Sequence, residues 1–330
     1  MSSSPHFGIV IPVLNRAREI RRAIDSCLVQ SFPDFEIIVV DDNSSDGTAA
    51  VVSSVADNRV RLLRQGRPGL CPARNQGVRA TSAEWVIFLD SDHELLPGGL
   101  GRICRETESV SRETGRLGFM FGFDDGRSSP DPLPPAGALD YTAWLRWIDC
   151  VRWSDALWVT RRSTFEHCTL PESFAFEFSY HLAFATRFTS LIVPEKVAFQ
   201  HTDSPNRCTL LRDRPPSDVA RRYADAAADW AQVLREHGPA LRRWAPHRYQ
   251  RVRRAYAVSE AMAGKRWRGL RASLAGIREG PLSVLNWLLP VFVLLGPRVL
   301  NRAKTLRSHR IERVRYPSDR TAAPAASGRL

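Results

Sequence analysis

The chain of 330 residues is basic, with a formal net charge of +12, and 43% of its residues are hydrophobic. These proportions are ordinary for a globular protein and exclude a disordered chain or one wholly embedded in a membrane. The charge is uneven, because residues 216–330 hold 23 Lys and Arg against 8 Asp and Glu, whereas residues 1–215 hold 24 against 27. A near-neutral first part with a basic, apolar-interrupted last third favours an anionic membrane surface as partner over nucleic acid.

The first 90 residues alternate short apolar runs with helical patterns. The runs rich in β-branched residues predict strands at residues 7–13, 35–40, 60–63 and 85–89. Apolar residues at helical spacing predict helices at residues 20–28, 48–56 and 73–80. Strands that alternate with helices in this order are typically parallel, with right-handed crossovers. The sequence therefore predicts an α/β sheet flanked by helices.

The second half is less regular. A proline-rich excursion is expected at residues 124–138, and further strands at 156–159 and 190–193. A helix is expected to begin at Ser217 and to be closed by Gly238-Pro239. We therefore divide the chain into an α/β domain at residues 1–215, a helical, membrane-associating region at 216–316 and a disordered tail at 317–330.

Membrane contact is expected at residues 282–295, which are almost wholly apolar. This run is too short to span a bilayer, for which about 20 residues are needed. A series of arginines follows it from Arg298, as suits docking to anionic lipid headgroups. The alternative is a buried helical hairpin packed on the first domain. Because no signal peptide is recognisable, we expect a cytoplasmic protein, peripheral on the inner face of the cell membrane.

Carboxylates follow two of the predicted strands directly. Asp41 and Asp42 come after the second strand, and Asp90 and Asp92, spaced by one residue, come after the fourth. In open α/β sheets, ligands bind beyond the carboxyl ends of the strands. Carboxylate oxygens there suit a divalent cation that carries a phosphate-bearing substrate. The sequence therefore predicts a metal-dependent site at this edge.

Four motifs in this order resemble glycosyltransferase family 2. They are residues 9–16 (IVIPVLNR), 39–48 (VVDDNSSDGT), 73–75 (ARN) and 88–92 (FLDSD), and the resemblance covers roughly residues 7–210. It implies a GT-A fold, a nucleotide-binding mixed sheet with a bound Mg²⁺ or Mn²⁺. It also implies inverting transfer of a sugar from a nucleotide-sugar donor to a polysaccharide or lipid-linked saccharide acceptor.

The resemblance also assigns roles to single residues. Those expected to bind the donor nucleotide are Pro12, Asn15, Asp41, Asp42, Arg74, Asp90 and Arg207. Asp42 would accept a hydrogen bond from the base, whereas Asp41 would cap the turn or lie beside the ribose. Arg74 and Arg207 would approach the diphosphate. Asp90 would contact the ribose or the water shell of the metal.

The metal and the acceptor need further groups. Asp92 and the late histidine, His201, are the expected metal ligands by resemblance. Glu177 is the expected general base, although Phe178 stands where the family often has an Asp. The rival bases are Glu172, Asp155 and His181.

Two other functions stay open. A polyprenyl-phosphate acceptor is already anionic and needs no strong base, which suits the missing acid at Phe178. A catalytically degenerate, membrane-bound scaffold would also explain that departure.

Overall fold

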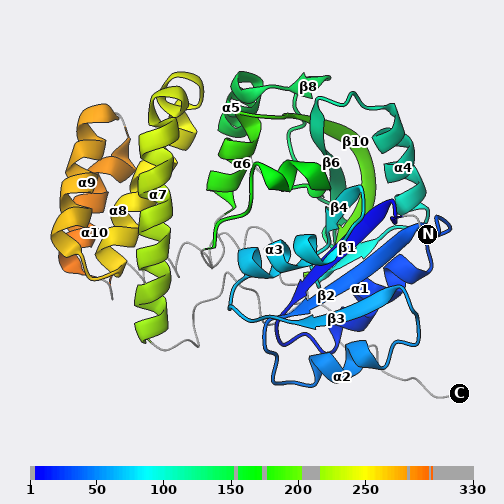
Figure 1. Ribbon diagram of the computed structural model, residues 1–330. Coiled ribbons are helices and arrows are strands. Elements are labelled where there is room, and N and C mark those ends of the chain that lie inside the picture. Colours follow the sequence, from blue (N-terminus) through cyan, green and yellow to red (C-terminus); the bar gives the residue numbers. More distant parts are fainter. Residues whose placement is uncertain are drawn as a thin grey trace, which may run out of the picture.

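The computed structural model describes residues 4–151, 155–172, 177–202, 216–280, 283–296 and 299. Within them, one mixed sheet lies beside a layer of C-terminal helices (Figure 1). The strand order is β3-β2-β1-β4-β9-β6-β10-β5, with β7 paired to β6 and β8 to β10. The strands are β1 (Phe7–Val13), β2 (Phe35–Asp41), β3 (Val60–Arg64), β4 (Trp85–Phe88), β5 (His93–Leu95), β6 (Thr114–Phe123), β7 (Ser128–Ser129), β8 (Ala138–Leu139), β9 (Leu157–Arg161) and β10 (Thr189–Gln200).

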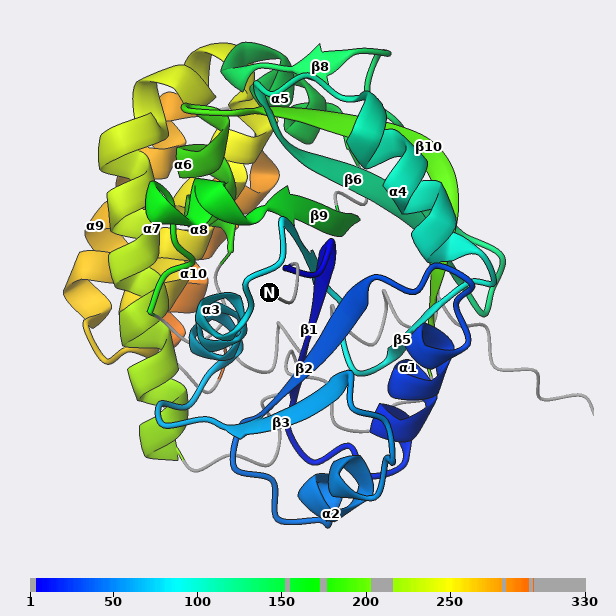
Figure 2. The same ribbon diagram turned by 45° about the vertical axis from the view of Figure 1, so that its right-hand side comes forward.

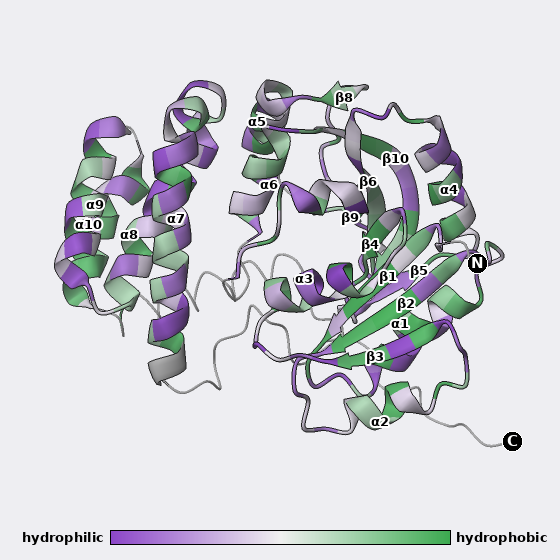
Figure 3. Ribbon diagram, viewed as in Figure 1, coloured by the Kyte–Doolittle hydropathy of each residue, from purple (hydrophilic) through white to green (hydrophobic). Residues whose placement is uncertain are grey.

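The four strands predicted from the first 90 residues are confirmed, and β1 to β4 are all parallel. Their carboxyl ends therefore meet at one edge of the sheet. β9 runs antiparallel to both β4 and β6, which makes the sheet mixed. As Figure 3 shows, these central strands are strongly hydrophobic, because helices cover both of their faces.

The long strand β6 was not predicted. Three glycines and a buried arginine interrupt its apolar pattern. A Cβ added at Gly118 would lie 2.7 Å from a side-chain atom of Ile192 and 2.8 Å from one of Trp158. The glycine thus lets the neighbouring strands bring large side chains over β6, a requirement of packing that leaves no local signal.

Helices cover the two faces of the parallel strands. The helices of this part are α1 (Glu19–Leu28), α2 (Thr48–Ser53), α3 (Leu70–Ala80), α4 (Gly99–Ser109), α5 (Tyr141–Cys150) and α6 (Phe178–Ala185), with a 3₁₀ helix at Arg162–Glu166. Ile9 and Ile11 pack with α1, whereas Val10 between them packs with α3 on the opposite face (Figure 2). This alternation is the period of two expected of a strand.

Four further helices form the layer beside the sheet: α7 (Pro216–Trp244), α8 (Pro246–Met262), α9 (Arg266–Glu279) and α10 (Val284–Leu295). Val233 and Leu241 of α7 share a core with Trp144 of α5 and Leu182 of α6. The prediction that Gly238-Pro239 closes α7 was wrong. Proline removes one helical hydrogen bond, but burial of Val233 and Leu241 on either side of Pro239 keeps the helix continuous.

No helix in the described ranges is both long and apolar enough to cross a membrane. The predicted tail at 317–330 and nearly all of residues 297–316 lie outside those ranges. The helices of the C-terminal layer begin at residue 216, and the domain boundaries themselves stay predictions.

Candidate active site

The loops after β1 and β2 are braced against each other. Asn15 adopts a left-handed backbone, with φ of 52°, a conformation that asparagine tolerates better than most residues. Its Oδ1 accepts a hydrogen bond from the backbone N of Ser45 at 2.8 Å. Asp41 is buried, and its Oδ1 accepts one from the backbone N of Ser44 at 3.0 Å. Both side chains therefore shape the loop that faces the predicted nucleoside pocket.

Asp42 and Pro12 lie at the same edge. Oδ2 of Asp42 accepts a hydrogen bond from the backbone N of Gly69 at 3.1 Å, which ties the end of β2 to the start of α3. Pro12 is buried opposite Val40 of β2, just beyond Val10, the last β1 residue that pairs with β4. β1 and β4 cease to pair at this point, where the site begins.

Residues Asp90-Ser91-Asp92, here called the DxD segment, follow β4 at the same edge. Ligand atoms of Asp90, Asp92 and His93 all lie within 4.8 Å of one another, close enough to hold one metal ion. The ring of His93 is buried against Phe121, with 4.9 Å between the ring centroids. Neither ring nitrogen of His93 has a hydrogen-bond partner among the described residues. Two carboxylates and an unpartnered imidazole are a donor set that suits a divalent cation.

His93 was not predicted as a ligand. Its only signal in the sequence is its place directly after Asp92, where the family often has a third acid. It is also the first residue of the short strand β5, whose pairing with β10 holds the backbone at this point.

Arg74 reaches the DxD segment from α3. Its Nη2 donates to Oδ1 of Asp90 at 2.7 Å, and its Nη1 donates to Oε1 of Glu177. Burial alone would raise the pKa of Asp90, but the neighbouring positive charges and hydrogen bond, with Arg74 first among them, together outweigh burial and hold the pKa below its ordinary value. One ion-pair network thus joins Arg74, predicted to bind the diphosphate, to Asp90 and to the predicted base, Glu177.

His181 extends this network behind Glu177. Its Nε2 is 3.8 Å from Oε2 of Glu177, and its Nδ1 is 2.7 Å from Nη1 of Arg116. Because a guanidinium only donates, Nδ1 must accept and the ring proton lies on Nε2. Burial, Arg116 and Arg74 hold the pKa of His181 well below its ordinary value, so the ring is neutral. With its acceptor nitrogen already used, His181 is a poor candidate for the base.

Arg116 is a functional candidate that sequence reasoning missed. It is fully buried on β6, and its Nε donates to Oγ of Ser190 at 2.9 Å. The guanidinium carbon lies 4.1 Å from the ring centroid of Trp158 and 4.3 Å from that of Phe184. Burial lowers its pKa to about 10, while the aromatic faces favour the cation. The rings of Trp144, Trp158 and Phe184 therefore surround this one charge.

Asp155 lies two residues before the start of β9, beside the DxD segment. Val159 of β9 pairs with Ile87 of β4 in antiparallel register, so the chain before β9 runs alongside the residues after β4. The residue as a whole is exposed, but desolvation and the carboxylates of Glu177 and Asp90 raise the pKa of Asp155 to about 6. A carboxyl group with such a pKa is well suited to accept a proton near neutral pH.

His201 lies close to the DxD segment but faces other acids. Its backbone N donates to the carbonyl oxygen of Asp92 at 2.9 Å. Its ring Nε2 is 2.7 Å from Oε1 of Glu94, and its Nδ1 is 3.9 Å from Asp124. The structure thus places His201 next to the predicted metal ligands without joining its ring to their cluster. Arg207 lies outside the described residues.

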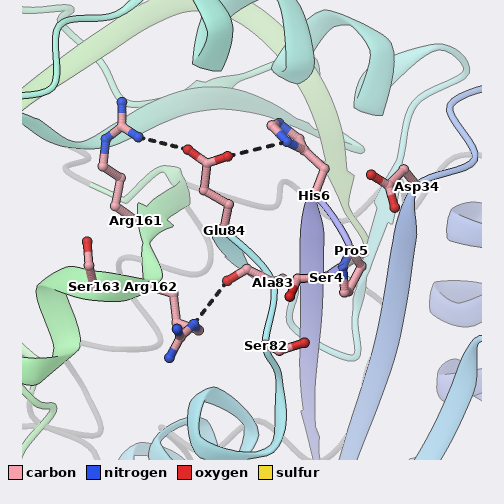
Figure 4. A pocket seen from close by; sticks show the side chains of 10 residues that line it. All are labelled: Ser4, Pro5, His6, Asp34, Ser82, Ala83, Glu84, Arg161, Arg162 and Ser163. Atoms are coloured by element: carbon pink, nitrogen blue, oxygen red, sulfur yellow. Dashed lines mark hydrogen bonds and ion pairs between the residues drawn. The ribbon is translucent and has the colours of Figure 1, made fainter. Parts of the chain in front are cut away.

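A separate cleft of about 380 Å³ opens at the other end of the strands (Figure 4). His6 and Glu84 lie there just before β1 and β4, and Arg161 ends β9. Nη1 of Arg161 donates to Glu84 at 3.1 Å, and Arg162 donates to the carbonyl oxygen of Ala83 at 3.1 Å. Both arginines of this cleft thus bind groups of the protein itself. The cleft lies at the edge of the sheet opposite to the DxD segment.

A mixed sheet whose parallel strands deliver a DxD segment to their carboxyl edge defines a GT-A type glycosyltransferase fold. Residues 8–109 match the family described as Glycosyl transferase family 2. All four motifs lie within this match, so the resemblance predicted from them is confirmed for residues 8–109.

Similar proteins agree with this match. A succinoglycan biosynthesis protein, ExoO of Rhizobium meliloti, is 38% identical over 127 residues, which cover 38% of this chain and 36% of ExoO. A GalNAc(5)-diNAcBac-PP-undecaprenol beta-1,3-glucosyltransferase of Campylobacter jejuni is 39% identical over 106 residues, 31% of this chain and 34% of that protein. The match thus spans about a third of each relative's length.

A solved structure is similar over more of the chain. The crystal structure of S. aureus TarS 1–349 in complex with UDP-GlcNAc superposes with a TM-score of 0.56 and 17% identity. The alignment covers 83% of this chain and 81% of that one. At this identity the likeness shows that the two share a fold, and it confirms the predicted GT-A class.

Proposed function

We propose that this protein is a metal-dependent, inverting glycosyltransferase that moves a sugar from a nucleotide-sugar donor to a polysaccharide or lipid-linked saccharide. The observation that carries the proposal is the cluster of Asp90, Asp92 and His93 at the carboxyl edge of the parallel strands. The relatives support the acceptor class, since one is named for succinoglycan biosynthesis and another for an undecaprenol-linked glycan. TarS, which shares the fold, is described in complex with UDP-GlcNAc.

The donor would bind across the loops after β1, β2 and β4. Asn15 and Asp41 hold the loop that forms one wall of the nucleoside pocket. Asp42, whose position is fixed by Gly69, would accept a hydrogen bond from the base. Arg74 lies beside Asp90 and would place positive charge near the diphosphate.

Asp92 and His93 would hold Mg²⁺ or Mn²⁺, with Asp90 shared between the metal and Arg74. The buried, unpartnered ring nitrogens of His93 support this donor set, because an imidazole desolvated without a partner otherwise costs stability. A divalent ion bound there would stabilise the charge of the departing nucleoside diphosphate as a Lewis acid. His201 stays a proposed ligand, which requires its ring to turn from Glu94 towards Asp92.

Inversion requires a base that takes the proton of the attacking acceptor hydroxyl. We propose Glu177 as the base, held in place by Arg74. Asp155 is the rival that the structure favours most, because its carboxyl lies near Glu177 and has a raised pKa. Glu172 is exposed and lies 3.3 Å from Arg67, which makes it a poorer candidate.

The test is release of nucleoside diphosphate from a panel of UDP-, GDP- and dTDP-sugars with Mn²⁺ or Mg²⁺. We expect one donor to be turned over, and Asp92→Asn to abolish turnover while Asp131→Asn, which changes an exposed carboxylate elsewhere, does not. Glu177→Gln and Asp155→Asn are compared with the productive donor, and a loss confined to Asp155→Asn would move the role of base to Asp155. If no donor is turned over or bound, the glycosyltransferase proposal fails and the scaffold function is favoured.

We propose further that the protein works peripherally on the inner face of the cell membrane, where lipid-linked acceptors are found. The basic last third of the sequence supports this location.

A further inference from the structure

The last two helices carry large apolar side chains on their outer surfaces. Nine of the exposed large hydrophobic residues in the described ranges lie in α9 and α10, and only Val29 and Leu133 lie elsewhere. The nine, here called the outer apolar face, are Trp267, Leu274, Val284, Leu285, Trp287, Leu288, Val291, Leu294 and Leu295. α9 and α10 lie at the side of the helical layer farthest from the sheet (Figure 1). Apolar residues gathered in this way typically mark an interaction surface.

α10 is rotated so that its polar side faces the protein and its apolar side faces outward, the reverse of a helix that faces water. Its polar residue, Asn286, is 1% exposed and points into the protein. Nδ2 of Asn286 donates to Oε1 of Gln250 at 3.0 Å and to the carbonyl oxygens of Gly276 at 3.0 Å and Gly280 at 2.9 Å. Its Oδ1 accepts from Nη1 of Arg254 at 2.9 Å. These four hydrogen bonds fix the rotation of α10, with its polar side inward.

The outward side of α10 is apolar over a wide arc. At about 3.6 residues per turn, its seven members of the outer apolar face cover roughly half of the circumference. The helix contains no charged residue. A surface helix in water normally buries its apolar stripe and exposes its polar one, so the outer side of α10 suits an apolar environment.

The charges of the neighbouring helix identify that environment. On α9, exposed Trp267, Arg271, Leu274 and Arg278 follow one another at spacings of four, three and four residues, so they share one stripe. The acid at the end of α9, Glu279, is already paired with Nη1 of Arg253 at 2.7 Å. The exposed charges of α9 are therefore positive and interleaved with apolar side chains. Such a stripe suits the interface of an anionic bilayer, where tryptophan and arginine bridge the apolar and polar zones.

We propose that the outer apolar face inserts into the headgroup region of an anionic membrane, with α10 lying in the plane of the bilayer. A second copy of this chain would bring the same arginines against each other, whereas anionic headgroups neutralise them. The face thus provides the membrane contact of the enzyme, and this inference rests on the proposed location at the membrane but not on the proposed sugar transfer.

The test is flotation of the full chain with vesicles that contain phosphatidylglycerol, compared with vesicles of phosphatidylcholine alone. Leu288→Glu with Val291→Glu places two charges in the face. We expect the wild type to float with the anionic vesicles and the double variant to lose at least tenfold in partitioning. The matched control is Val29→Glu with Leu133→Glu, which makes the same change at the other exposed hydrophobic residues and should float like the wild type.

Circular dichroism, chain mass by light scattering and donor turnover complete the comparison. An intact helical spectrum and unchanged turnover in the face variant separate membrane docking from folding and from sugar transfer. The proposal is overturned if the wild type does not float or if the face variant floats equally well. It is also overturned if the wild type forms a dimer that the face variant abolishes while neither binds vesicles.

Discussion

Nη2 of Arg74 lies 2.7 Å from Oδ1 of Asp90, which joins the third helix to the first acid of the DxD segment. The other amino group of the same guanidinium contacts Glu177. The side chain of Arg74 is buried, whereas the two carboxylates are partly exposed. One buried cation therefore sets the distance between the proposed metal site and the proposed base.

Replacement of this cation should destabilise the protein. Arg74→Met removes both ion pairs and leaves two carboxylates close together, so we expect a loss of about 1–3 kcal/mol in the free energy of unfolding. Urea denaturation at pH 7 measures it. The matched control is Arg21→Met. Arg21 forms an exposed ion pair with Asp25, four residues later in α1, and such a pair contributes about 0.3–0.5 kcal/mol. Equal losses in the two variants would contradict the central role of Arg74.

The effect of Arg74 should also depend on pH. Because Arg74 holds the folded-state pKa of Asp90 below its ordinary value of about 3.9, the pair stabilises the fold fully above that value. The stabilisation is lost as the pH falls through the depressed pKa. The advantage in melting temperature of the wild type over Arg74→Met should therefore be largest near pH 7 and shrink as the pH falls towards the depressed pKa of Asp90. A difference that stays constant down to pH 3 would argue against the Asp90 pair.

Asp155 should show the opposite dependence. Its pKa is raised to about 6, so the folded protein disfavours the ionised carboxylate relative to the unfolded chain. Wild-type stability should therefore fall relative to Asp155→Asn as the pH rises from about 4 through 6. Thermal melts of both proteins between pH 4 and 8 measure this, and parallel curves would contradict the raised pKa.

His93 should contribute to metal affinity before any donor is present. His93→Phe keeps an aromatic ring against Phe121 but removes both ring nitrogens, so Mn²⁺ should bind about tenfold more weakly or worse. Electron paramagnetic resonance of free Mn²⁺ measures this directly. The control His167→Phe changes an exposed histidine away from the cluster. Unchanged affinity in His93→Phe would remove this residue from the metal site.

The sequence predicted the parts of the site that depend on local pattern. Runs of β-branched residues located β1 to β4, and acids directly after two of them located Asp42 and Asp92 at one edge. The sequence could not show that Arg116 is buried among aromatic rings, because its partners come from strands and helices far apart in the chain. Nor could it show that α7 continues through Pro239, since packing on both sides overrides the local signal.

Gly77 couples the packing of α3 to the site. A Cβ added there would overlap the side chain of Val10 on β1, so the helix that carries Arg74 lies directly on the strand. In an exposed helix Gly→Ala would be stabilising, but here overpacking should make Gly77→Ala destabilising by about 1–3 kcal/mol. Donor turnover should fall as well, because α3 must move away from Asp90.

The matched control is Gly66→Ala, since a Cβ at Gly66 has no neighbour within 4 Å. We expect that variant to keep wild-type stability and turnover. Combining Gly77→Ala with Val10→Ala frees the space that the new methyl group needs. The double variant should therefore lose less free energy of unfolding than the two single variants lose together. Additive losses in urea denaturation would show that Val10 is not the obstacle and that α3 is positioned by other contacts.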